Sequence, residues 1–213
     1  MKTTTIGSES QHESKTKLLD AALHVIRAKG YSATRVEDIC EAAGLTKGSF
    51  FHHFSSKEEL ALAAAEHFSK FANGAFAGAP YQTRSDPLDR LLGYVETRRH
   101  LLRGELPDCT CLLGTLVQET YDTHPLIREA CETYFGAHAA SLIPDIEAAI
   151  RKYGIQPTWT AESLANYMQA VIQGAFVLAK ARKSKEVAAS CLDHLHRYLK
   201  MLFLYSQGAK ERL

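Results

Sequence analysis

The chain has 213 residues, a formal net charge of +1 at pH 7 and a hydrophobic content of 46%. This length can bury a sizeable core in one large or two small domains, and the near-neutral charge argues against indiscriminate binding to nucleic acids. No apolar run approaches a membrane span, the first 13 residues lack the apolar core of a signal peptide, and the five cysteines lack the spacing of a disulfide framework. We therefore expect a cytoplasmic globular protein with no membrane partner.

Helical periodicity runs through almost the whole chain, whereas strand alternation and internal repeats are absent, so we expect an all-α fold. Residues 1–13 are polar and are expected to form a flexible arm. Helices are expected at residues 14–29, 34–43, 47–54, 57–75, 88–102, 109–121, 126–153 (interrupted near Pro144), 161–182 and 184–205. Residues 14–57 are expected to form a three-helix N-terminal domain, and residues 58–213 a larger helical domain.

Residues 34–54 have the pattern of two short helices joined by a tight turn. Thr34 is expected to cap the first helix, and Glu37 completes a capping box three residues later. Gly44 can adopt the left-handed conformation that ends this helix, and Thr46 can cap the next one. The pattern predicts a helix-turn-helix, whose second helix enters the major groove of DNA.

The residue types at the start of the second helix suit contact with phosphate. Lys47 supplies charge, Gly48 allows a close backbone approach, and Ser49 can donate a hydrogen bond to a phosphate or a base edge. Residues 15–57 contain seven Lys and Arg against four Asp and Glu, a net charge of +3, so positive charge is concentrated in this segment. The alternative is an ordinary pair of amphipathic helices, which leaves Lys47 and Gly48 unexplained.

Residues 15–60 resemble the N-terminal domain of the TetR family of bacterial transcriptional regulators. The resemblance rests on the runs Gly44-Leu-Thr-Lys-Gly-Ser-Phe-Phe-His-His-Phe54 and Ser56-Lys-Glu-Glu-Leu60. It implies a homodimeric regulator, in most cases a repressor, that binds a palindromic operator in double-stranded DNA and is released by a small-molecule effector. Phe51 stands where Tyr is common in the family, so a phosphate contact would shift to His52 or His53. The residues expected at the DNA are Thr34, Arg35, Thr46, Lys47, Gly48, Ser49, Phe51, His52, His53 and Lys57.

The last expected helix has an apolar face too broad for a single packing partner. The helix before it carries apolar residues on one side, and together the two helices predict a dimer interface. The family resemblance implies that two helices from each protomer form a four-helix bundle. The alternative is that both faces pack within one protomer. The residues expected at the interface are Met168, Val171, Gly174, Ala175, Cys191, Leu195, Leu199 and Leu202.

Arg99 falls near the middle of the apolar stripe of the helix at residues 88–102, whereas Arg98 lies at the edge of that stripe. A guanidinium on a buried face needs a partner. Arg99 is therefore interpreted either as an anchor for an anionic effector or, in the alternative, as one half of an internal salt bridge or a side chain that extends its charged end to water.

The segment at residues 109–119 is similar to a Gly-Cys-Leu-Leu-Gly-Asn-Leu element of one TetR subgroup, some members of which sense electrophiles or unsaturated acids. The similarity implies a sensing role for this cysteine pair, Cys109 and Cys111: if the Cys111 thiol is accessible and acidic, its alkylation or oxidation would release the protein from DNA. Cys111, Thr115 and Gln118 also share a small, mildly polar helix face, which would form the wall of an effector pocket or a close helix contact. The alternative is that both cysteines are small core residues. A Cys-x-Cys pair with no His at ligand spacing is a weak metal signal, and no metal or cofactor is expected.

Two other protein classes compete with a DNA-binding regulator. A thiol-dependent enzyme built on Cys111 would need a paired base, and the nearest histidine in sequence is His124. A helical ligand-binding protein that does not use DNA would leave Lys47 and Gly48 without a role. We therefore expect a regulator and no enzymatic activity.

Overall fold

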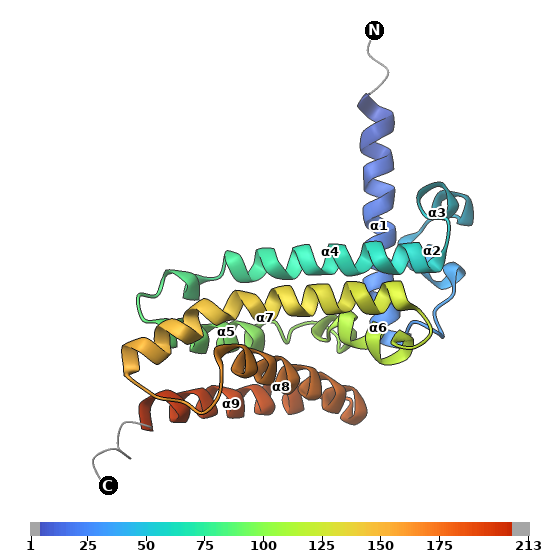
Figure 1. Ribbon diagram of the computed structural model, residues 1–213. Helices are drawn as coiled ribbons and strands as arrows, with labels where there is room; N and C mark the ends of the chain where they lie inside the picture. The colour runs from blue at the N-terminus through green and yellow to red at the C-terminus, as the bar shows by residue number, and fades with distance from the viewer. Residues whose placement is uncertain (1–4, 206–213) are drawn as a thin grey trace. The chain divides into compact units, whose positions relative to one another are not determined.

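The computed structural model describes the backbone of residues 5–205 and the side chains of residues 11–204. Within this range the chain is helical and contains no strand, which confirms the expected all-α fold (Figure 1). The elements are α1 (Thr5–Lys29), α2 (Val36–Ala43), α3 (Lys47–His53), α4 (Lys57–Ala77), η1 (Pro80–Thr83), α5 (Pro87–His100), η2 (Pro107–Cys109), α6 (Leu112–Thr120), α7 (Pro125–Tyr153), α8 (Ala161–Arg182), α9 (Lys185–Lys200) and η3 (Met201–Tyr205).

The N-terminal arm expected at residues 1–13 is largely replaced by helix. Helix α1 already begins at Thr5, so residues 5–13 belong to it, and residues 1–4 lie outside the described part of the chain. The polar composition of residues 5–13 did not prevent helix formation, because α1 continues without a break into a segment whose apolar face is buried.

The chain divides into two compact units with boundaries that differ from the expected domains. Unit 1 comprises the described residues up to Phe71 together with Cys111–Tyr134, and unit 2 comprises Ala72–Thr110 and the described residues from Phe135 onward. Helices α4 and α7 pass through both units. Helix α6, which was expected in the larger C-terminal domain, therefore belongs with the helix-turn-helix.

The core of unit 1 forms around α1, which packs against α2, α3 and α6. Leu18, Ala22 and Ile26 are fully buried and lie four residues apart, on one face of α1. Helix α3 is only two turns long, too short to be stable alone, and is held by its buried Phe50 and by Phe54 directly after it.

The cap of α2 differs from the expected one by a single residue. The N-cap is Arg35, whose backbone N–H donates to the carboxylate of Asp38 at 2.9 Å. The side chain of Thr34 instead points inward, and its hydroxyl donates to the carbonyl of Gly30 at 2.6 Å. The other two signals are confirmed, since Gly44 ends α2 with φ 64° and the Thr46 hydroxyl accepts the N–H of Ser49 at 3.2 Å.

Unit 2 is built around α9, which packs against both α5 and α8 (Figure 1). Spacings of three and four residues place the buried side chains of each helix on one face. They are Met168, Ile172, Ala175 and Ala179 on α8, Ala188, Leu192, Leu195 and Leu199 on α9, and Leu88, Leu91, Leu92 and Val95 on α5.

Helix α7 continues through Pro144, so the interruption expected there is wrong. Proline removes one backbone hydrogen bond, but Leu142 and Ile146 on either side of it are buried, and this packing keeps the helix continuous. None of the described helices is long and apolar enough to cross a lipid bilayer.

Candidate functional site

The N-terminal end of α3 presents the residues expected at DNA. Thr46, Lys47 and Gly48 are exposed, and Ser49 is partly exposed. Phe51, one turn further along, exposes 58% of its surface, an unusual position for a large aromatic side chain. Phe50 next to it is fully buried, so the same two-turn helix is anchored on one face and open on the other.

Two histidines at the end of α3 are held by α1. The exposed His52 contacts Gln11 through Nε2 at 3.2 Å, and His53 contacts the hydroxyl of Ser14 at 2.6 Å. Burial, the neighbouring His52 and the charge of Lys15 lower the pKa of His53. The lowered pKa favours the neutral form of the His53 imidazole.

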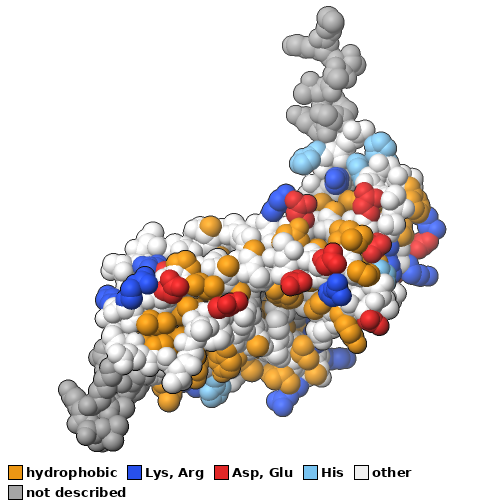
Figure 2. Space-filling model, in the orientation of Figure 1, with side chains coloured by type: hydrophobic (Ala, Val, Ile, Leu, Met, Phe, Trp, Pro, Cys, Tyr) orange, Lys and Arg blue, Asp and Glu red, His pale blue; other side chains and the backbone are white. Residues whose placement is uncertain are grey.

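Acidic partners neutralise part of the basic surface of the helix-turn-helix. Lys47 forms an ion pair with Glu37, and the Arg35 guanidinium pairs with Asp38 at 3.1 Å. The Arg35 backbone N–H and guanidinium hold the pKa of Asp38 well below its ordinary value. In Figure 2, Lys and Arg side chains are mixed with Asp and Glu side chains over this unit. Any phosphate that binds Lys47 or Arg35 would have to replace these carboxylates.

Two residues expected at the DNA are engaged inside unit 1. Thr34 is only 1% exposed, so its side chain is not available to DNA, which corrects that expectation. The ammonium of Lys57 donates to the carbonyls of Tyr31 and Thr34, each at 3.0 Å, and lies 4.3 Å from the centre of the Tyr31 ring. Burial lowers the pKa of Lys57, an effect that the carboxylate of Glu119 opposes.

The turn between α1 and α2 is held from both sides by residues distant in sequence. Glu119 on α6 accepts the backbone N–H groups of Tyr31 at 3.2 Å and Ser32 at 2.8 Å. Lys57 binds carbonyls of the same turn, and Gly30 before it adopts φ 88°. An added Cβ at Gly30 would collide with the Glu119 carboxylate. Helix α6 is thereby tied to the start of the helix-turn-helix, a link that the sequence did not indicate.

The cysteine segment does not provide the accessible thiol that the sensing hypothesis requires. Cys109 and Cys111 are 8% and 9% exposed, and Cys109 donates to the carbonyl of Arg103 at 2.9 Å. Cys111 precedes the first residue of α6 instead of lying within a helix that starts at residue 109. The side chains of Thr115 and Gln118 donate to carbonyls four residues earlier in the same segment. These observations favour the alternative that both cysteines are small core residues.

Arg99 forms a salt bridge, as one of its two interpretations proposed, but it lies on the surface. Its side chain is 51% exposed and pairs with Asp193 of α9 at 2.8 Å. Arg98 is the arginine directed toward the interior of unit 2. Its guanidinium lies 4.4 Å from the centre of the Phe76 ring and donates to the Tyr94 hydroxyl at 3.0 Å. The periodicity argument therefore chose the wrong one of two adjacent arginines.

A cavity of about 250 Å³ lies within unit 2, between the end of α4, η1, α5 and α7. Its aromatic lining consists of Phe76, Tyr81, Tyr94 and His138. Its polar lining includes Asn73, Gln82, Ser141 and an ion pair between Arg90 and Asp145 at 2.6 Å. Aromatic walls with a few polar groups are typical of small-molecule sites.

His138 is the most strongly perturbed group in the cavity wall. Its Nε2 lies 2.8 Å from the Tyr94 hydroxyl and 2.9 Å from Nη2 of Arg98. Burial, together with the charge of Arg98, lowers the pKa of His138 to about 3. Because a guanidinium can only donate, Nε2 must be an acceptor, and the proton of the neutral ring is on Nδ1.

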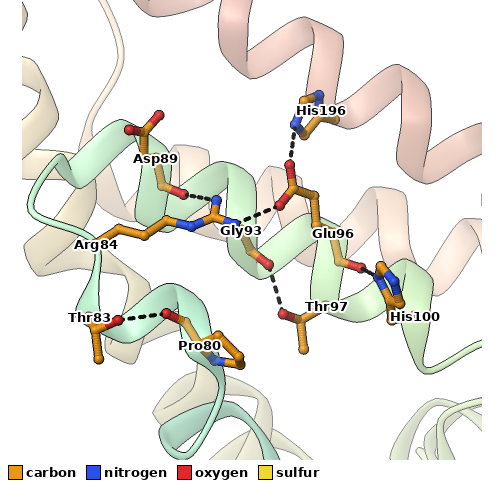
Figure 3. A network of polar contacts seen from close by, with 9 residues as sticks. All are labelled: Pro80, Thr83, Arg84, Asp89, Gly93, Glu96, Thr97, His100 and His196. Atoms are coloured by element: carbon orange, nitrogen blue, oxygen red, sulfur yellow. Dashed lines mark hydrogen bonds and ion pairs between the residues drawn. The ribbon is translucent and has the colours of Figure 1, made fainter.

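A polar network positions η1 against α5 beside this cavity (Figure 3). Arg84 donates to the carbonyl of Asp89 at 3.0 Å and pairs with Glu96 at 3.0 Å, and the second oxygen of Glu96 faces His196 of α9 at 3.3 Å. Gly93 allows the close approach, since an added Cβ would collide with Cβ of Tyr81. The network thus fixes Tyr81, one of the cavity walls.

The residues expected at the dimer interface separate into two groups. Met168, Ala175, Leu195 and Leu199 are at most 2% exposed within the protomer, so they form its core and cannot face a partner. Gly174 is exposed, and Val171, Cys191 and Leu202 are partly exposed. Other exposed apolar residues lie nearby, and hydrophobic side chains gather over α8 and α9 in Figure 2. The additional exposed apolar residues of α8, α9 and the start of η3 are Tyr167, Val177, Leu178, Tyr198 and Met201.

Two family models match the chain. The model described as bacterial regulatory proteins, tetR family, matches residues 18–64. The model described as transcriptional regulator LmrA/YxaF-like, C-terminal domain, matches residues 87–193. The two matches include the helix-turn-helix and most of the described part of unit 2.

Relatives and solved structures agree with these matches. The HTH-type transcriptional repressor DhaR of Mycobacterium sp. (strain GP1) is 25% identical over 169 residues, which cover 79% of this chain and 83% of DhaR. The HTH-type transcriptional regulator LmrA of Bacillus subtilis is 24% identical over 190 residues, 87% of this chain and 98% of LmrA. For the HTH-type transcriptional regulator CymR of Pseudomonas putida, the match is 46% identical over 59 residues, 28% of this chain and 29% of CymR. A TetR transcriptional regulator from Chloroflexus aurantiacus has a TM-score of 0.78 and 25% identity, with 90% of this chain and 96% of that chain covered.

The all-helical fold and the exposed α3 define a DNA-binding regulator of the helix-turn-helix class. The chain belongs to the TetR family of bacterial transcriptional regulators, with a C-terminal part like that of LmrA and YxaF.

Proposed function

We propose that the protein is a homodimeric repressor that binds a palindromic operator and is released when a small molecule enters the cavity of unit 2. The observation that carries the DNA-binding part is the open end of α3, where Lys47, Gly48 and Ser49 are available to phosphates and base edges. Thr46, Phe51, His52 and His53 flank this end, and Arg35 at the cap of α2 reaches the adjacent backbone.

The exposed apolar surface of α8 and α9 supports a dimer. Tyr167, Val171, Gly174 and Leu178 follow one another at spacings of four, three and four residues, next to the buried stripe that begins at Met168. Two such surfaces related by a two-fold axis form an interface in which each residue meets its counterpart. A dimer places two copies of α3 in successive major grooves, about 34–36 Å apart.

Release follows if the effector prefers a conformation in which the two copies of α3 no longer match that spacing. A difference of about 3 kcal/mol in effector affinity between the two conformations changes operator affinity by roughly two decades. The cavity suits this role because it is enclosed by four elements, so a ligand can change how they pack.

Selection of bound sequences from a random duplex library, at two salt concentrations, tests the DNA-binding part. We expect a palindromic consensus whose affinity falls as salt rises. Lys47→Ala should weaken binding to all sequences and lower the slope of log affinity against log salt concentration by about 1. Lys70→Ala, on the exposed part of α4, is the charge-matched control. Absence of any enriched sequence would count against the proposal, as would an unchanged slope for Lys47→Ala.

Blocking the cavity tests the effector part. Ser141 lines the cavity, and the exposed Ala140 precedes it on α7 without lining it. Ser141→Trp should leave operator binding intact and abolish release by an effector found in a compound screen, whereas Ala140→Trp should respond normally. Equal release of both variants by the effector would show that the effector binds outside this cavity.

A further inference from the structure

An uncompensated positive charge lies directly behind the wall of the unit 2 cavity, where Arg98 contacts the lining residues Phe76, Tyr94 and His138. Arg90 is compensated by Asp145, with contacts at 2.6 and 2.8 Å. Arg98 pairs with no carboxylate in the described part of the chain, and its hydrogen bonds go to the neutral groups Tyr94 and His138. A partly buried guanidinium held only by neutral partners attracts an anion, because the cost of removing its charge from water is not offset within the protein.

One hydrogen-bond donor in the cavity wall is also left without a partner. Nε2 of His138 is occupied by Tyr94 and Arg98, which leaves the proton on Nδ1. Among the described residues, Nδ1 of His138 makes no hydrogen bond. A ligand acceptor at this edge of the cavity would receive that N–H while gaining the field of the Arg98 charge.

The size and walls of the cavity set the rest of the ligand. A dry cavity of about 150 Å³ lined by apolar side chains is enough to bind benzene. A volume of about 250 Å³ therefore admits one aromatic ring with a short substituent. Phe76, Tyr81 and Tyr94 offer faces and edges for such a ring, and Phe76 already stacks beneath the Arg98 guanidinium.

We propose that the effector is a small aromatic carboxylate whose ring lies between Phe76, Tyr81 and Tyr94 and whose carboxylate accepts the N–H of His138, within the field of the Arg98 charge behind the cavity wall. The proposal rests on the proposed function, because it names the ligand class of the cavity assigned there. A cation of the same size is disfavoured by Arg98, and a neutral isostere cannot compensate the guanidinium.

The test is titration calorimetry of the full-length protein with benzoate, phenylacetate and 3-phenylpropanoate, each against its primary amide. At least one acid should bind tenfold or more tightly than its amide. Arg98→Met should remove this preference, measured within the variant as the ratio of acid affinity to amide affinity. Arg99→Met is the matched control, since it removes the same charge from the adjacent, exposed position, and it should keep the preference.

The proposal is overturned if no acid binds better than its amide, if Arg98→Met keeps the preference, or if both arginine variants lose it equally. Operator binding measured on the same samples separates this outcome from failure of the proposed function. An amide that releases the operator as well as its acid refutes the ligand class alone. If an acid binds as expected but the protein binds no operator DNA, the regulator proposal alone is refuted.

Discussion

The neutral imidazole of His138 should make the protein less stable at acidic pH. Its pKa is about 3 in the folded protein, because of burial and the charge of Arg98, whereas a histidine in an unfolded chain has a pKa of about 6.5. Between these values the unfolded state binds one proton more than the folded state. The contribution of His138 to stability is therefore fully present above about pH 6.5 and is lost as the pH falls toward 3.

The size of the effect follows from the two pKa values. The slope approaches about 1.4 kcal/mol per pH unit for a single proton. Between pH 7.5 and pH 5 the free energy of unfolding should fall by about 2 kcal/mol through His138 alone. Because the pKa of His138 in the folded protein lies well below 5, this free-energy change comes almost entirely from protonation of the histidine in the unfolded chain.

Urea unfolding at fixed protein concentration and at pH 7.5, 6 and 5 measures this loss. His138→Gln keeps an acceptor for Tyr94 and Arg98 but does not titrate, so its stability should fall by about 2 kcal/mol less than that of the wild type over the same range. His100→Gln removes an exposed imidazole of α5 and is the control. Equal pH dependence in His138→Gln and the wild type would refute the assignment of a neutral His138.

Three further predictions test other parts of the structure. Glu119→Ala should destabilise the protein by about 2 kcal/mol and weaken operator binding, because two backbone N–H groups of the α1–α2 turn lose a charged acceptor. Thermal unfolding measures the first effect and a DNA-binding titration the second. Gly93→Ala should cost about 1–3 kcal/mol in urea unfolding despite the better helix propensity of alanine, because the new methyl group meets Cβ of Tyr81. Leu178→Glu should shift the protein from dimer to monomer in sedimentation analysis, whereas Leu126→Glu, at an exposed apolar position of α7, should not.

Each of these predictions has an outcome that contradicts it. A Glu119→Ala variant with wild-type stability would show that water replaces the carboxylate without cost. A stabilised Gly93→Ala variant would show that η1 moves away freely from α5. A Leu178→Glu variant that remains dimeric would place the interface outside α8 and α9.

The sequence predicted the local features that depend on near neighbours. The turn at Gly44, the cap at Thr46 and the helical periodicity each arise from interactions within a few residues, so they can be read from a short window. The helix-turn-helix followed from these signals together. The cap of α2 was misplaced by one residue because Thr34 and Arg35 both precede an acidic residue at the right distance, and the packing of Thr34 decided between them.

The sequence pattern could not decide which of two adjacent helix positions faces the protein interior. Arg98 and Arg99 differ by 100° around α5, and both lie close to the same apolar stripe. Only the positions of Phe76 and His138 decided which arginine packs against the cavity wall. Met168 and Tyr167 begin two apolar stripes on α8 in the same way, one buried and one exposed.

The sequence by itself determined an all-helical chain with a DNA-reading helix, because helix formation, capping and turn geometry are local. The tertiary structure decided the cavity, the neutral His138 and the link from Glu119 to the α1–α2 turn. These features join residues 40 or more positions apart, Arg98 with His138 and Ser32 with Glu119. Their existence depends on how helices pack, and packing determines which groups lose water and which charges meet.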